Sequence, residues 1–212
     1  MKLHFPLSLV ATIALAVPGI AIAHEAPHGA SGTTATLADT KAALRDLWIG
    51  HVFWVRNVVD ARIEGNAAES KAAEAQVVSN ARAIADAIEP FYGQAAADKL
   101  FGLLAGHWGA ISDYLDATRD SNKSGQDVAL KSLLANADQI AVFLSGANPN
   151  LPADALRGLL TAHGSHHVQQ IQQLKAGQYE QEAKTWSAMT AHMYVIADAL
   201  ADGIAKQFPD KF

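Results

Sequence analysis

Apolar residues recur at intervals of three and four from about residue 40 onward, which is the spacing of one face of an α-helix. A first stripe runs from Leu44 through His51 to Val59, and a second from Val77 to Ile88. Strand-like alternation of Val, Ile and Thr is missing. The pattern therefore predicts an all-α protein. We expect six helices, near residues 38–64, 68–89, 94–119, 125–145, 152–175 and 179–207.

The same apolar pattern occurs three times. Residues 40–95 align without a gap with residues 96–151 and with residues 152–207. Self-similarity at such a period marks a supersecondary unit that buries its apolar face against its neighbours. Each unit contains one pair of residues suited to a helix stop and a turn: Gly65-Asn66, Ser121-Asn122 and Gly177-Gln178. The predicted fold is a six-helix up-down bundle built from three tandem 56-residue helical hairpins.

Polar residues recur on the apolar stripes at equivalent points of the three units. The first arms carry His51, His107 and His163, and the second arms carry Asn80, Asn136 and His192. In each unit the midpoint between the two residues falls on the turn, so antiparallel arms place both side chains at one level. We therefore expect these six residues to face inward and to share one layer of the bundle.

A layer of buried imidazoles needs an explanation. Each buried imidazole costs a few kcal/mol, roughly, unless both its nitrogens find partners. One interpretation is that imidazoles from different helices converge on a metal ion or a haem iron, since helical bundles often build such sites in their cores from side chains of facing helices. The other is that each histidine donates to the Asn or His that faces it. Such polar pairs would fix the register of the helices, as a buried Asn does in coiled coils.

The third unit favours metal. His166 and His167 lie one helical turn beyond His163, and Met189 lies one turn before His192. Thioether beside imidazole suits copper. The candidate metal ligands are His51, His107, His163, His192, His166 and His167, with Asn80, Asn136, Met189 and Arg56 in supporting positions.

Copper or zinc is preferred over haem as the bound group. Haem iron needs only one or two axial imidazoles, and the Cys-x-x-Cys-His sequence for covalent attachment is missing. Arg56 is the strong cation close to the layer, and it is available to an anionic ligand or a propionate.

The amino-terminal residues 1–23 have the pattern of a secretory signal peptide. Lys2 precedes an apolar run that ends in Ala21-Ile22-Ala23, a small-x-small cleavage site. Residues 24–37 read as a flexible leader, followed by one helical domain over residues 38–212. We expect a periplasmic or secreted protein with no transmembrane segment after cleavage. His24, as the new amino terminus, and His28 form a second candidate chelate for copper.

Composition and charge exclude several kinds of site and partner. The chain has no cysteine, so thiolate ligands, thiol nucleophiles and disulfides are excluded. Its formal net charge is −5 without a large basic cluster, so we expect no nucleic-acid partner. A phosphate-binding glycine loop, a nucleophile elbow, His-Glu-x-x-His and the Glu-x-x-His pairs of di-iron bundles are all missing. The sequence contains no catalytic constellation.

Four segments resemble those of a group of small, uncharacterised bacterial helical proteins: 47–52 (LWIGHV), 91–93 (FYG), 147–149 (ANP) and 206–212 (KQFPDKF). The resemblance covers the chain from about residue 44 onward, and it implies no activity, cofactor or substrate. Two functions follow from the residues themselves. The first is an exported, soluble helical protein that binds copper or zinc through a core layer of histidines. The alternative is a non-catalytic scaffold or interaction protein of the cell envelope, in which the layer is a hydrogen-bonded register device.

Overall fold

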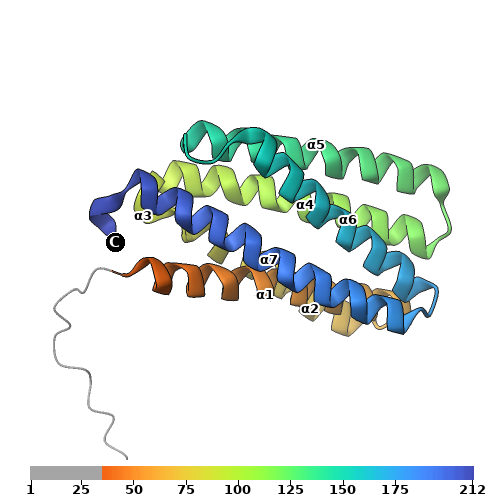
Figure 1. Cartoon of the computed structure of the whole chain (residues 1–212). Helices are drawn as coiled ribbons and strands as arrows, with labels where there is room; N and C mark the ends of the chain where they lie inside the picture. The colour runs from red at the N-terminus through yellow and green to blue at the C-terminus, as the bar shows by residue number, and fades with distance from the viewer. Residues whose placement is uncertain (1–34) are drawn as a thin grey trace, which may run out of the picture. The chain divides into compact units, whose positions relative to one another are not determined.

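A computed structural model of the chain describes residues 35–212 (Figure 1). Within this range the protein is helical and contains no strand. The all-α prediction with six long helices is confirmed. The long helices are α1 (Leu37–Glu64), α2 (Ala67–Asp86), α4 (Gln94–Arg119), α5 (Lys123–Ala147), α6 (Ala153–Lys175) and α7 (Tyr179–Gln207). A short helix, α3 (Glu89–Tyr92), and a 3₁₀ turn, η1 (Pro209–Lys211), complete the elements.

The second helix differs from its prediction at its end. We expected it to continue to residue 89, whereas α2 ends at Asp86 and α3 begins at Glu89. Pro90 explains the break, because a proline ring clashes with the carbonyl four residues earlier and offers no N–H to the helix. That carbonyl belongs to Asp86, the last residue of α2.

The helix ends follow from local side chains. Thr36 and Asp39 form a capping box at the start of α1, in which each side chain accepts a hydrogen bond from the other residue's backbone N–H. The three predicted turns each contain a residue in the left-handed region, with φ of 77° at Gly65, 57° at Ser121 and 67° at Gly177. This conformation ends a helix and reverses the chain.

Each long helix packs against two neighbours in a closed order. α1 contacts α2 and α7, α2 contacts α4, α4 contacts α5, α5 contacts α6, and α6 contacts α7. The helices lie side by side along their length in Figure 1. In addition, α6 contacts both α1 and α4. These last contacts bring together the three helices that carry His51, His107 and His163.

The apolar core divides into three clusters of buried residues, and none of them contains a histidine. Trp48 of α1 belongs to one cluster, with Leu100 and Met189, and Val55 of α1 belongs to another, with Ile111. His51 lies between Trp48 and Val55 along the helix. The histidines therefore interrupt an otherwise apolar interior.

Among the described helices, α5 is long and apolar enough to cross a membrane by length and composition alone. Its inner face packs in the core through Leu133 and Ile140. Val128, Leu134 and Val142 are exposed on the same helix. A core helix passes the same test, so the finding identifies no membrane span.

Candidate metal centre

Four histidines from three helices meet in the core. His51 comes from α1, His107 from α4, and His163 and His167 from α6. Each offers a ring nitrogen, and these four nitrogens all lie within 4.8 Å of one another. The four side chains are buried, with exposed fractions of 5%, 4%, 1% and 1%. We call this group the histidine layer.

The spacing within the histidine layer is compatible with ligands around one ion. The ring centroids are 4.5 to 6.1 Å apart. One pair of nitrogens, Nε2 of His163 and Nε2 of His167, is separated by 3.2 Å. Two imidazole nitrogens bound to one tetrahedral ion at about 2.0–2.1 Å would be about 3.3 Å apart. The α6 pair therefore already has the spacing of two ligands, and no carboxylate belongs to the group among residues 35–212.

Most ring nitrogens of the histidine layer have no hydrogen-bond partner within the described chain. These nitrogens are Nε2 of His51, both nitrogens of His107, and Nδ1 of His163 and of His167. A neutral imidazole carries one N–H donor and one lone pair, and both lose the hydrogen bonds of water on burial. Each buried nitrogen without a partner costs about 1–3 kcal/mol. A bound ion would compensate part of this cost, because it accepts a lone pair from each ligand.

Burial keeps the histidine layer uncharged. It lowers the pKa of His51 to about 3, with a smaller contribution from the nearby His107. It lowers the pKa of His107 to about 4, although hydrogen bonding with the Asn136 side chain acts in the opposite direction. Burial and then repulsion from the neighbouring imidazoles place the pKa values of His163 and His167 well below the ordinary value. All four rings are therefore neutral near pH 7, the form that coordinates a metal.

The residues expected opposite the histidines make a different contact. Nδ2 of Asn80 donates to the carbonyl oxygen of Leu47 at 3.0 Å, and Nδ2 of Asn136 donates to that of Leu103 at 2.9 Å. His192 joins the carbonyl oxygen of Leu159 at 2.8 Å, and its Nε2 must carry the proton because a carbonyl only accepts. Each hydrogen bond spans 33 residues. We call these three hydrogen bonds the tethers, since each fixes a second-arm side chain to the helix turn before a layer histidine.

A small residue directly precedes each of the three layer histidines His51, His107 and His163, and it lies beside the tether of the same unit. A Cβ atom on Gly50 would lie 2.9 Å from Nδ2 of Asn80, and one on Gly106 would lie 3.1 Å from Nδ2 of Asn136. Glycine therefore makes room for the two asparagine tethers. The third unit combines Ala162 with His192 at the corresponding positions.

Two of the six candidate ligands lie outside the group of four. His166 and His192 are half-buried, and their rings form an edge-to-face pair with centroids 5.5 Å apart. The sequence pattern predicted His192 as the fourth histidine of the layer, and this prediction is wrong, because the fourth imidazole of the group comes from His167. The signal for His167 is its position four residues after His163, which puts both rings on one face of α6.

Arg56 and Met189, the supporting residues, have partners within the protein. Nε and Nη2 of Arg56 donate to the two carboxylate oxygens of Glu182 at 2.7 and 3.0 Å, and Gln170 donates to the same carboxylate at 2.8 Å. Burial by itself would raise the pKa of Glu182, but these hydrogen bonds outweigh it and keep that pKa below the ordinary value. Met189 is fully buried in the apolar cluster that contains Trp48. The charge of Arg56 is therefore compensated inside the chain.

His24 and His28, together with the expected signal peptide and most of the leader, lie outside the described residues. No known protein family, no curated protein sequence and no solved structure matches the chain.

Proposed function

We propose that the protein binds one transition-metal ion, copper or zinc, through His51, His107, His163 and His167. The observation that carries this proposal is the convergence of four buried, neutral imidazoles from three helices within 4.8 Å. Lone core histidines are normally satisfied by a neighbouring side chain. Here four gather instead, and Nε2 of His51 and Nδ1 of His163 and of His167 have no partner.

Imidazole donors restrict the choice of ion. Magnesium and calcium prefer oxygen ligands, whereas zinc and copper accept imidazole readily. Haem fits the layer poorly, since a flat macrocycle needs open space beside its axial ligand and the four rings are only 4.5 to 6.1 Å apart. Copper and zinc are therefore the proposed ions, and no reaction is proposed for them.

Architecture and export belong to the same proposal. Three tandem hairpins in an up-down order would explain why the three tethers all join residues 33 positions apart. The amino-terminal pattern supports export to the periplasm or the medium. A neutral histidine site in an exported protein would meet metal ions supplied from outside the cytoplasm.

The second candidate function is a scaffold of the cell envelope without a metal. The tethers favour it specifically, because they join second arms to first arms without any ion. The two functions differ in whether the histidine layer is required. A scaffold needs the tethers alone, whereas a metal protein needs the layer.

Metal analysis of the protein tests the proposal directly. The full chain would be purified from its native compartment without a His-tag, and its metal content and absorption spectrum measured. We expect about one equivalent of copper or zinc. Competition with a calibrated chelator should then show that His107→Ala weakens binding at least about tenfold.

A control variant separates the layer from the amino terminus. His28→Ala should leave the affinity close to that of the wild type, because His28 is not part of the layer. Equal affinities for His107→Ala and the wild type would remove the layer from the site. Loss of binding in His28→Ala alone would make the amino-terminal segment the chelator.

A further inference from the structure

Two histidines of the described chain lie outside the histidine layer, and they lie together. The six histidines of residues 35–212 divide into the four of the layer and a pair formed by His166 of α6 and His192 of α7. The two rings meet edge to face, with centroids 5.5 Å apart. We call His166 and His192 the outer pair. Both residues are half-buried, so solvent reaches them, whereas the layer is buried.

The outer pair lies beside the part of α6 that carries His163. Nε2 of His192 bonds to the carbonyl oxygen of Leu159 at 2.8 Å. Leu159, His163 and His166 follow one another at intervals of four and three residues, so they lie on one face of α6. The contact of His192 is thus one helical turn before His163, and His166 is one turn after it. The outer pair is therefore next to the layer, between α6 and α7.

The tether of His192 leaves one ring nitrogen able to bind an ion. Because Nε2 donates its proton to the carbonyl oxygen of Leu159, Nδ1 carries the lone pair. Metal-binding histidines commonly donate their second N–H to a backbone carbonyl, which fixes the orientation of the ring. Asn80 and Asn136 make the same tether in the other units, so the tether itself requires no imidazole. In the outer pair, Nδ1 of His166 is buried without a partner within the described chain.

The separation of the two rings is compatible with one shared ion. Two imidazoles bound to a tetrahedral ion at about 2.0–2.1 Å have ring centroids about 5 Å apart. The outer pair, at 5.5 Å, is close to this spacing. Two protein ligands hold an ion less firmly than four, and water can occupy the remaining positions. An ion bound by the outer pair can therefore move on to the layer.

We propose that the outer pair is the loading site through which copper or zinc ions enter the histidine layer. This inference rests on the proposed function. An ion first exchanges part of its water for His166 and His192, and then exchanges these ligands for His163 and the other layer histidines. Stepwise exchange avoids taking a bare ion into the apolar core, where its solvation energy would be lost. The outer pair is not part of the final ligand set, and it controls how fast the ion enters and leaves.

Cobalt(II) is a suitable probe, because it replaces zinc in histidine sites and absorbs visible light strongly when its ligands are tetrahedral. The metal-free full-length protein, without a His-tag, would be mixed with cobalt(II) at pH 7.5. The growth of the tetrahedral spectrum gives the rate of entry into the layer, and excess chelator added to the loaded protein gives the rate of exit. A cobalt titration gives the affinity. The wild type tests the proposed function, and without a tetrahedral spectrum both that function and this inference fail.

The variant His166→Gln removes one imidazole of the outer pair and keeps a polar side chain on α6. We expect entry and exit each to slow at least about fivefold, with the affinity within about twofold of the wild type. The two rates change together because a site on the route alters the barrier and leaves both end states as they were. A structural disturbance of the layer would change the affinity instead. Gln169→Ala, an exposed change three residues further along α6, is the matched control and should alter neither rate.

A second variant removes the other imidazole and keeps the tether. His192→Asn combined with Ala162→Gly reproduces the pair found at Asn80 and Gly50, and it should slow entry and exit in the same way. Melting temperatures without metal check that both variants are folded. If the wild type loads cobalt and both variants load and release it at wild-type rates, the outer pair is not the loading site and the proposed function stands. If His166→Gln weakens the affinity about tenfold and enters at the wild-type rate, His166 belongs to the final ligand set and the inference is overturned.

Discussion

The histidine layer and the tethers are two sets of buried polar side chains in the same bundle, and they differ in how their polar atoms are satisfied. Every tether side chain donates to a backbone carbonyl oxygen at 2.8 to 3.0 Å, although Oδ1 of Asn80 and Oδ1 of Asn136 are buried without a partner. The layer has one nitrogen–nitrogen contact, at 3.2 Å, and several nitrogens without partners. Polar groups that only set helix register are expected to resemble the tethers. Within residues 35–212, the layer histidines make no such hydrogen bond to a backbone carbonyl oxygen.

His192 makes the difference clear. It is a histidine in a tether position, and its Nε2 hydrogen bond is complete without a metal. Residue type alone therefore does not mark a ligand. The distinguishing feature is the convergence of unpartnered nitrogens, which His163 and His167 show and His192 does not.

The largest expected effect is acid destabilisation of the metal-free protein by the histidine layer. The folded pKa values of His51 and His107, about 3 and about 4, lie below the ordinary value of 6.5. As the pH falls below 6.5 the unfolded chain takes up protons first, so stability is full above that pH and is lost toward pH 4. Each layer histidine should remove about 1.4 kcal/mol per pH unit. Urea unfolding at pH 7, 6 and 5 measures this slope.

The variant His107→Leu sharpens this test. It removes one titrating group, so the slope between pH 6 and pH 5 should decrease by about 1.4 kcal/mol per pH unit. An unchanged slope would show that acid acts elsewhere in the protein.

Added metal should give the next largest effect. Copper or zinc should raise the melting temperature by several degrees at pH 7.5, because an ion that binds only the folded state stabilises it by mass action. The rise should persist at pH 5, because the layer histidines of the folded protein, with pKa values of about 3 at His51 and about 4 at His107, are still neutral there and able to coordinate the ion. Superimposable melting curves at both pH values, for both metals, would favour the scaffold function.

Exchanging polar for apolar residues should affect the layer and the tethers in opposite ways. His107→Leu should abolish tight metal binding and leave the metal-free stability at pH 7 unchanged or higher, since it removes buried unpartnered nitrogens. Asn136→Ala should cost about 1 kcal/mol through loss of its hydrogen bond and should retain metal binding. Denaturant unfolding and chelator competition on both variants measure the two quantities. Equal losses of stability would contradict the division into layer and tethers.

The smallest effect is expected when the third tether is rebuilt like the other two. His192→Asn combined with Ala162→Gly reproduces the pair found at Asn80 and Gly50. The metal affinity should stay within about twofold, and stability should fall by no more than about 1 kcal/mol, the cost of glycine in a helix. A large loss of affinity would place His192 among the ligands.

The helices and turns were predictable because local sequence determines them. The apolar spacing identified the long helices, and Gly65, Ser121 and Gly177 lie at the predicted turns. The recurrence of His51, His107 and His163 indicated that these side chains would meet. The apolar stripe does not predict the end of α2, because the stripe reaches Ile88 whereas Pro90 ends the helix at Asp86.

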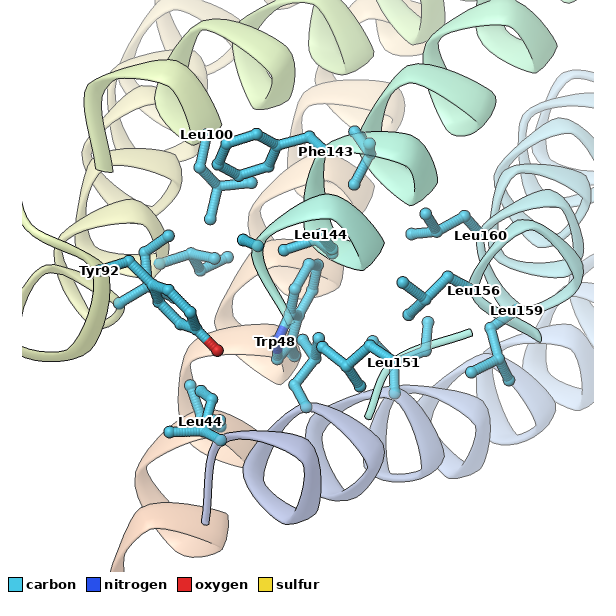
Figure 2. Close-up of a pocket in the computed structure, with 17 residues that line it drawn as sticks. Leu44, Trp48, Tyr92, Leu100, Phe143, Leu144, Leu151, Leu156, Leu159 and Leu160 are labelled. Atoms are coloured by element: carbon cyan, nitrogen blue, oxygen red, sulfur yellow. The ribbon is translucent and has the colours of Figure 1, made fainter. Parts of the chain in front are cut away.

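The composition of the layer was predictable only in part. His166 and His167 are neighbours in sequence, so they differ by about 100° around the helix, and the rotation of α6 decides which one faces inward. The tether acceptors left no signal, since every residue has a backbone carbonyl. An apolar cavity lined by Trp48 and by residues of all seven α-helices (Figure 2) depends on how their side chains fit together, which periodicity does not describe.

The neutrality of the four layer histidines has a consequence for the oxidation state of a bound ion. A site with no carboxylate adds no negative charge, so an ion carries its whole charge into the core. The solvation energy lost on burial grows with the square of that charge, about fourfold from a monovalent to a divalent ion. Copper held here would therefore be stabilised in its reduced, monovalent form relative to copper in water. The layer would then determine the oxidation state of the metal as well as its location.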